Sequence, residues 1–297
     1  MRLQSIFLIL AVVLSGCVGQ PTASTTAGVI IKGFAANPPE AEFGSLVFFT
    51  ATIKNVGEQE ATNVLVKLIG LTDEWTKEAQ GESRIDDQWR SGAKLAGAET
   101  DKLFPAIPAR GFTEGEEVFK EWKAFPPQKD VELSYGVTAR LEYNYQTVSE
   151  SLIRIVSISY FRQTNNAGGL IDSKTSGGPF VVGVFPTSTV IGERSSKMTL
   201  QIEVRNVGGG KASFNTAIDS VNVNTFSRLV GDSSKNFKID GCSKTVKLVD
   251  SKVGRIICEV TLPEPSPYID MPLVVKVDYK YFVDNTIQVK VLPKRGT

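Results

Sequence analysis

Two stretches of the sequence share one pattern: TATIKNVGEQEATNVLVKL at residues 50–68 and LQIEVRNVGGGKASFNT at residues 200–216. In each, apolar side chains alternate with polar ones until the chain reaches Asn-Val-Gly, and an alanine follows a few residues later. A period of two places one set of side chains inward and the other toward solvent. Each stretch therefore predicts a half-buried antiparallel strand.

The Asn-Val-Gly triplet predicts a turn at the end of each strand. Asn55 and Asn206 can hydrogen-bond the backbone two residues on, and Gly57 and Gly208 can adopt a positive φ. We expect these four residues to be structural, not to bind a ligand.

A second pair of similar stretches follows in the same order, VTARLEYNYQTVSESLIRI at residues 137–155 and LVVKVDYKYFVDNTIQVKV at residues 273–291. Tyr143 and Tyr145 align with Tyr279 and Tyr281. In both stretches we expect a strand, a short turn after the tyrosines and another strand. Tyr143 and Tyr279, or the tyrosines two residues on, are candidates for tying a loop to the edge of a sandwich, and packing as plain core aromatics is the alternative.

Two matches in the same order indicate a repeated domain. Each copy contains several short strands with Gly, Pro and Asn between them and no convincing helix, which is typical of a β-sandwich. The sequence predicts an all-β fold with two tandem Ig-like antiparallel β-sandwich domains at residues 29–161 and 180–297. Residues 162–179, rich in Gly, Ser, Asn and Thr, are expected to be a linker that allows the domains some freedom.

The segments IKNVGEQEATNVLVKL and VRNVGGGKA, each followed by a Tyr-x-Tyr strand, resemble Ig-like domains of the CARDB type from bacterial and archaeal surface proteins. The resemblance covers most of both domains and rests on structural positions. It implies tandem extracellular modules with adhesive, spacing or scaffold roles, and it implies no catalytic residues.

The N-terminus predicts export. An apolar run from Ile6 to Leu14 is too short to span a bilayer and long enough for a signal peptide, here residues 1–16. It ends in Leu-Ser-Gly before Cys17, which resembles the lipobox of prokaryotic lipoproteins and makes Cys17 the expected lipid attachment site. Residues 17–28 have the composition of a flexible tether. An uncleaved or differently processed leader is the alternative.

The remaining cysteines, Cys242 and Cys258, are expected to form a disulfide, because exported proteins occupy oxidising compartments. A hairpin that turns near Asp250 would place them opposite each other. Two free buried thiols are the alternative.

The composition argues against several kinds of chemistry. The chain contains no histidine, which removes the usual general base and the commonest zinc ligand. No phosphate-binding glycine loop occurs, and we expect no cofactor, no metal and no catalysis. The 33 basic and 32 acidic side chains nearly cancel, which argues against nucleic-acid binding.

All three tryptophans lie in the first domain. Trp122 is expected in the core. Trp75 and Trp89 flank a long polar segment within residues 72–116, where exposed indoles could stack on a polysaccharide or anchor a protein, although packing beneath their own loop is the favoured alternative.

Together these features predict a lipoprotein anchored in the cell membrane and facing the extracytoplasmic side. The expected role is a non-catalytic surface binding, adhesion or envelope-scaffold module with a protein partner at the cell envelope. The alternatives are an accessory subunit of a secretion, pilus or transport complex, and a carbohydrate-binding module.

Overall fold

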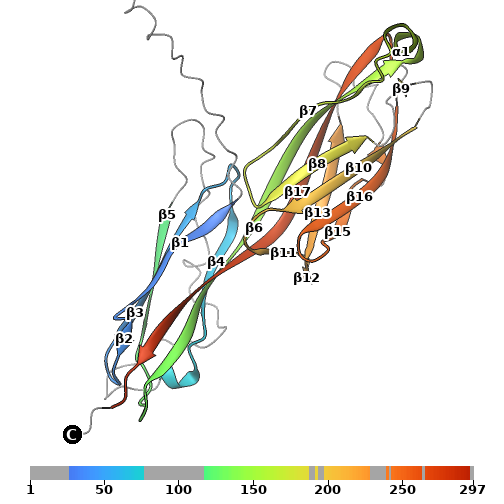
Figure 1. Cartoon of the computed structure of the whole chain (residues 1–297). Helices are drawn as coiled ribbons and strands as arrows, with labels where there is room; N and C mark the ends of the chain where they lie inside the picture. Colours follow the sequence, from blue (N-terminus) through green and yellow to red (C-terminus); the bar gives the residue numbers. More distant parts are fainter. Residues whose placement is uncertain are drawn as a thin grey trace, which may run out of the picture.

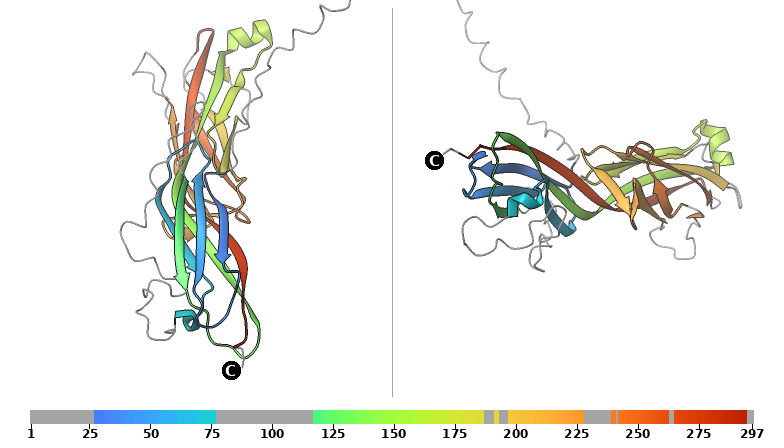
Figure 2. Two further views of the ribbon diagram at one scale, coloured as in Figure 1. Left: turned by 90° about the vertical axis from the view of Figure 1, so that its left-hand side faces the viewer. Right: turned by 90° about the horizontal axis from the view of Figure 1, so that it is seen from below.

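The computed structural model describes residues 27–76, 117–186, 191–192, 197–227, 239–240, 242–262 and 265–294. Within these ranges the chain consists mainly of antiparallel strands, with one α-helix, α1 (Ile158–Thr164), and a 3-10 turn, η1 (Asp73–Thr76). Two β-sandwiches lie end to end in an elongated molecule (Figure 1; Figure 2). The prediction of an all-β chain with two sandwiches is confirmed.

The first sandwich has a three-stranded outer sheet in the order β1-β3-β5. Strand β3 contains the first copy of the repeated pattern, and its alternate residues Val47, Phe49, Ala51 and Ile53 are fully buried. The alternation therefore places one face of β3 against the core. The strands of this half are β1 (Val29–Asn37), β2 (Glu40–Ala41), β3 (Val47–Asn55), β4 (Thr62–Ile69) and β5 (Glu117–Ala124).

The second sandwich has a four-stranded outer sheet in the order β14-β16-β10-β8. Strand β10 contains the second copy of the pattern and buries Met198, Leu200, Ile202 and Val204. The strands of this half are β7 (Gly169–Thr175), β8 (Phe180–Pro186), β9 (Ile191–Gly192), β10 (Lys197–Asn206), β11 (Lys211–Phe214), β12 (Ala217–Ile218), β13 (Ser220–Ser227), β14 (Ile239–Asp240), β15 (Lys244–Lys247) and β16 (Val253–Thr261).

Two long strands, β6 (Leu133–Ser157) and β17 (Tyr268–Val291), run through both sandwiches (Figure 1). They pair antiparallel without interruption, so that all 24 residues of β17 have a partner on β6. At the usual rise per residue this ladder is about 80 Å long. The two sandwiches are therefore parts of one body that share a sheet.

Each long strand contributes to both halves. The first part of β6 pairs with β4, and the last part pairs with β7. Strand β17 runs in the opposite direction, beginning beside β13 of the second sandwich and ending beside β2 of the first. Each sandwich is thus completed by half of a strand from the other copy of the repeat.

This arrangement differs from two expectations. The turns expected after Tyr145 and Tyr281 do not form, because both strands continue through those positions. In β6 the buried hydroxyl of Thr147 lies 2.7 Å from that of Tyr279, and in β17 the exposed carboxylate of Asp284 accepts hydrogen bonds from Arg140 on β6. The segment expected to be a free linker, residues 162–179, instead contains the end of α1 and all of β7, which is bonded to β6.

The buried apolar side chains form one cluster that includes residues of both sandwiches. Trp122 lies in this core with no exposed surface, as the sequence predicted. No helix among the described residues is long and apolar enough to cross a membrane.

Candidate functional site

Four tyrosines meet where the sandwiches join, at the midpoint of the β6–β17 ladder, which we call the waist. Tyr143 lies opposite Tyr281, and Tyr145 lies opposite Tyr279, with ring centroids 5.8 and 6.2 Å apart. All four rings are buried, and Phe180 packs 4.6 Å from the ring of Tyr279. The two Tyr-x-Tyr motifs thus form one aromatic cluster that joins the two cores.

The second tyrosine of each motif holds the loop that follows the repeated strand of its own copy. The backbone N–H of Gln59 donates to Tyr145 Oη at 3.0 Å, and that hydroxyl donates to the carbonyl of Gly177. In the second copy the N–H of Gly210 donates to Tyr281 Oη at 2.9 Å. Tyr145 and Tyr281 are therefore the tyrosines that tie a loop to the sandwich edge.

The Asn-Val-Gly triplets form the turns that the sequence predicted. The N–H of Gly57 donates to Asn55 Oδ1 at 2.9 Å, and the N–H of Gly208 donates to Asn206 Oδ1 at 3.2 Å. The glycines of the triplets were expected to allow a positive φ, but neither Gly57 nor Gly208 has one. They are required instead by a close contact. A Cβ atom on Gly57 would overlap the hydroxyl of Tyr145, and one on Gly208 would meet that of Tyr281.

Each triplet also fixes the start of its repeat at the waist. The N–H groups of Val56 and Gly57 both donate to the carbonyl of Gly28, directly before β1, at 2.8 and 3.1 Å. In the same way, Val207 and Gly208 bind the carbonyl of Pro179, directly before β8. The described chain therefore enters the molecule at its middle.

Burial changes the acidity of the waist tyrosines. It raises the pKa of Tyr145 to about 12 and raises those of Tyr143 and Tyr279 well above the ordinary value. Burial also raises the pKa of Tyr281. The four phenol groups are thus neutral at physiological pH, and they stabilise the waist through packing and hydrogen bonds.

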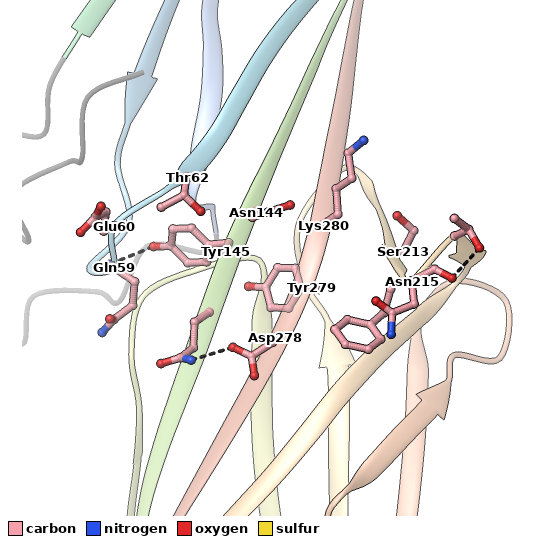
Figure 3. Close-up of a pocket in the computed structure, with 13 residues that line it drawn as sticks. Gln59, Glu60, Thr62, Asn144, Tyr145, Ser213, Asn215, Asp278, Tyr279 and Lys280 are labelled. Carbon is pink, nitrogen blue, oxygen red and sulfur yellow. Dashed lines mark hydrogen bonds between the residues drawn. The ribbon is translucent and has the colours of Figure 1, made fainter. Parts of the chain in front are cut away.

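A polar groove of about 740 Å³ crosses the other face of the shared sheet at the waist (Figure 3). Because side chains alternate along a strand, Asn144 and Lys280 point away from the tyrosine cluster. Pairing places them in one row with Thr62 of β4 and Ser213 of β11. This row forms the centre of the groove, and the β11–β12 hairpin and residues 59–62 form its walls.

The charged side chains on the floor of the groove form hydrogen bonds and ion pairs with neighbouring side chains of the protein. Asp278 accepts hydrogen bonds from Gln146 at 2.6 Å and from Asn224 at 3.0 Å. Lys280 pairs at 2.6 Å with Glu142, which also pairs with Lys67. Burial alone would raise the pKa of Glu142, but hydrogen bonds from the two lysines lower it overall. The groove therefore presents polar groups in fixed positions.

Two of the predicted site residues lie outside the described residues, Cys17 and Trp89. Trp75 is described, and it is fully buried, with its ring 5.3 Å from Tyr135 and 6.1 Å from Phe49. Trp75 is therefore not available as a binding residue, and the favoured alternative, packing in the core, is the one that η1 produces. Within the described ranges no three His, Cys, Asp or Glu side chains gather closely enough to hold a metal ion.

The predicted disulfide between Cys242 and Cys258 is present, with Cα atoms 5.2 Å apart. The chain turns at Asp250, as expected, but the strands on either side belong to different sheets. Cys242 instead reaches Cys258 because β14, just before it, pairs with β16. The bridge fastens this short strand segment to the outer sheet.

The groove was not predicted from the sequence. Its central residues, Thr62, Asn144, Ser213 and Lys280, lie within the repeated stretches, but on four strands that are far apart in the chain. Asn144 lies beside Lys280 only because β6 and β17 each continue from one sandwich into the other. The one sequence feature that marks the place is the Tyr-x-Tyr pair, because Asn144 and Lys280 are the residues between the tyrosines.

Comparison with known proteins shows weak likeness to β-rich proteins. Envelope protein VP37 from White Spot Syndrome Virus has 8% identity over 47% of this chain and 98% of its own, with a TM-score of 0.26. The collagen adhesin (CNA) from S. aureus has 10% identity over 91% and 94% (TM-score 0.10), and the CupB6 tip adhesin from Pseudomonas aeruginosa has 8% over 89% and 95% (TM-score 0.13). No family model and no curated protein sequence matches the chain.

Proposed function

We propose that the protein is a non-catalytic, lipid-anchored scaffold of the cell envelope, held at the extracytoplasmic side of the membrane through Cys17. The observation that carries the proposal is the unbroken pairing of β6 with β17. A single ladder through both sandwiches resists bending between them, as a spacer or scaffold requires. The lipobox-like sequence before Cys17 supports the anchor.

The point of attachment favours a scaffold over a projecting adhesin. The chain is fixed at Gly28, at the waist, and Cys17 precedes Gly28 by a short stretch. Fully extended, that stretch reaches about 37 Å. With the flexibility that its composition predicts, its root-mean-square length is about 18 Å. Half of the ladder is about 40 Å long, so an upright molecule would require the stretch to be fully extended. We therefore expect the long axis to lie along the membrane.

The anchor is tested by Cys17→Ser in the full-length protein. We expect loss of lipid labelling and release from the membrane fraction, because the thiol that would carry the lipid is missing. Unchanged labelling and membrane retention would refute the proposed attachment.

The orientation is tested separately with the lipidated protein in vesicles that contain an acceptor dye on the lipid headgroups. Fluorophores are placed at opposite ends of the ladder through Arg162→Cys and Lys294→Cys, both exposed positions. Energy transfer to the membrane should be similar from the two ends. Strong transfer from one end and none from the other would contradict the expected orientation while leaving the anchor intact.

The same geometry supports a second candidate role, as an accessory subunit of a membrane protein complex. A body kept close to the bilayer surface by a short tether stays within reach of integral membrane proteins. Mild detergent extraction should then recover integral membrane proteins with the lipidated chain in a fixed ratio. Recovery of the chain alone would favour the simple scaffold.

A further inference from the structure

The waist groove has the composition of a binding site for uncharged, hydroxyl-rich ligands. Its lining contains amide side chains (Gln59, Asn144, Gln146, Asn215), hydroxyl side chains (Thr62, Ser213, Thr216), three charged residues (Glu60, Asp278, Lys280) and Phe214. Tyr145 and Tyr279 also border the groove, but their rings lie in the buried cluster on the opposite face of the sheet. Carboxylates accept hydrogen bonds, ammonium groups donate them, and amides do both. Such a mixture suits a ligand whose groups also donate and accept, as sugar hydroxyls do.

The floor is organised before any ligand arrives. Asp278 is held by two amide donors, and two hydrogen bonds leave part of the accepting capacity of a carboxylate free. The amide of Asn144 makes no side-chain hydrogen bond among the described residues, and its position beside Lys280 is fixed by strand pairing. Groups that are already in position lose little conformational freedom when they bind.

Charge argues against an anionic ligand. Lys280 is the only basic residue in the described lining, and Glu142 already pairs with it. Glu60 and Asp278 give the lining an excess of negative charge. A phosphate or polyuronate would meet these carboxylates without a free cation to offset them.

The shape argues against an apolar peptide. Peptide grooves use apolar pockets for side chains or a free strand edge. Here the described floor is the face of a sheet, and its central row consists of Thr62, Asn144, Lys280 and Ser213. The partly buried ring of Phe214, on the wall, offers an apolar surface for the C–H face of a sugar ring.

We propose that this groove binds a neutral saccharide chain that crosses the shared sheet at the waist. The site is distinct from the two tryptophans that the sequence suggested, and the proposal does not depend on the lipid anchor. The groove opens on the sheet face opposite the tyrosine cluster against which Gly28 packs. In the anchored protein it would therefore face away from the side on which the tether leaves.

The test is calorimetric titration of the full-length protein in detergent with maltohexaose, laminarihexaose and chitohexaose, and with hexagalacturonate as the anionic probe. At least one neutral hexasaccharide should bind, and the anionic probe should not. Asp278→Asn and Asn144→Leu should each weaken that binding about tenfold, the usual effect of losing a hydrogen bond in such a site. Asn144→Leu also places an apolar group on the floor without changing the strand pairing.

Asp172→Asn is the matched control, because Asp172 is an exposed carboxylate on β7 outside the groove lining. It should bind as the unmodified protein does. Failure of all three neutral hexasaccharides to bind would overturn the proposal. Stronger binding of the anionic probe, or equal losses in Asp172→Asn and Asp278→Asn, would also overturn it.

Discussion

At the scale of the residue, the glycine of each Asn-Val-Gly turn is required by a close contact and not by its backbone angle. The space that a Cβ would occupy on Gly57 or Gly208 is taken by the hydroxyl of Tyr145 or Tyr281. Those hydroxyls are themselves fixed by hydrogen bonds to backbone groups of the loops. Glycine and tyrosine are therefore matched partners, which explains why both motifs occur in both copies.

Alanine at these positions should destabilise the protein. Gly57→Ala and Gly208→Ala each force a buried tyrosine to move, and such overpacking costs about 1–3 kcal/mol. Gly209 is the matched control, because a Cβ there meets no atom within 4 Å. Gly209→Ala should be neutral or stabilise by about 0.4–1 kcal/mol. The measurement is urea denaturation of each full-length variant, and equal losses in Gly208→Ala and Gly209→Ala would disprove the contact argument.

The waist tyrosines should make the fold sensitive to alkali. Burial raises the folded pKa of Tyr145 to about 12 from an ordinary value of 10.0. The folded state then favours the neutral phenol, so this contribution to stability is complete below pH 10 and is lost as the pH rises toward 12. Tyr143, Tyr279 and Tyr281 shift in the same direction.

In an alkaline titration, tyrosinate absorbance from these four residues should therefore appear together with the loss of near-ultraviolet circular dichroism. In denaturant the same residues should ionise near their ordinary pKa. Full ionisation of all seven tyrosines near pH 10 with an intact spectrum would show that the cluster is open to water.

At the scale of the element, strands were predictable and their connections were not. The alternation identified β3 and β10 and the buried face of each, because a period of two depends only on local sequence. The segments after the tyrosines contain Thr, Ser, Asn and Asp, which favour turns. In the structure these side chains serve the ladder, as where Arg140 binds both carboxylate oxygens of Asp284 at 2.7 and 2.8 Å.

Whether a strand turns back or crosses to the other sandwich depends on contacts between distant parts of the chain. An exchanged strand makes the same kinds of contact as one that folds back, so local sequence does not distinguish the two. The groove depends on this exchange, and for that reason it was missed. The turn residues Asn55 and Asn206 were predictable because the hydrogen bond that forms each turn, from the glycine N–H to the asparagine Oδ1, lies within the triplet.

The disulfide should stabilise the second sandwich. It joins the segment that follows β14 to β16 and closes a loop between positions 16 residues apart. The chain-entropy estimate for such a loop is about 3 kcal/mol. Replacing both Cys242 and Cys258 with serine should lower the free energy of unfolding by that order, as measured in guanidinium chloride. A reducing agent should produce the same shift in the unmodified protein, and no shift in either case would contradict a structural role.

At the scale of the whole molecule, the shared sheet makes the two copies of the repeat dependent on each other. The core is one cluster through the waist, and each sandwich lacks half of a central strand unless the other copy is present. The full chain should therefore unfold in one transition, with the same midpoint for tryptophan fluorescence and circular dichroism. All three tryptophans lie in the first copy, so fluorescence reports on that half alone. Two separated midpoints would show that the halves unfold independently.

A split chain tests the exchange directly. Cutting between Asn166 and Ala167, in the exposed connection after α1, leaves one repeat and one long strand in each fragment. If β6 and β17 need each other, each fragment alone should lack dispersed amide resonances, and mixing should restore a one-to-one complex with the spectrum of the intact chain. The competing outcome is equally specific, because a long strand that folds back after Tyr145 or Tyr281 would complete its own sandwich. Two fragments that fold separately and do not associate would show that the exchange is not required, and that the sandwiches can behave as independent domains.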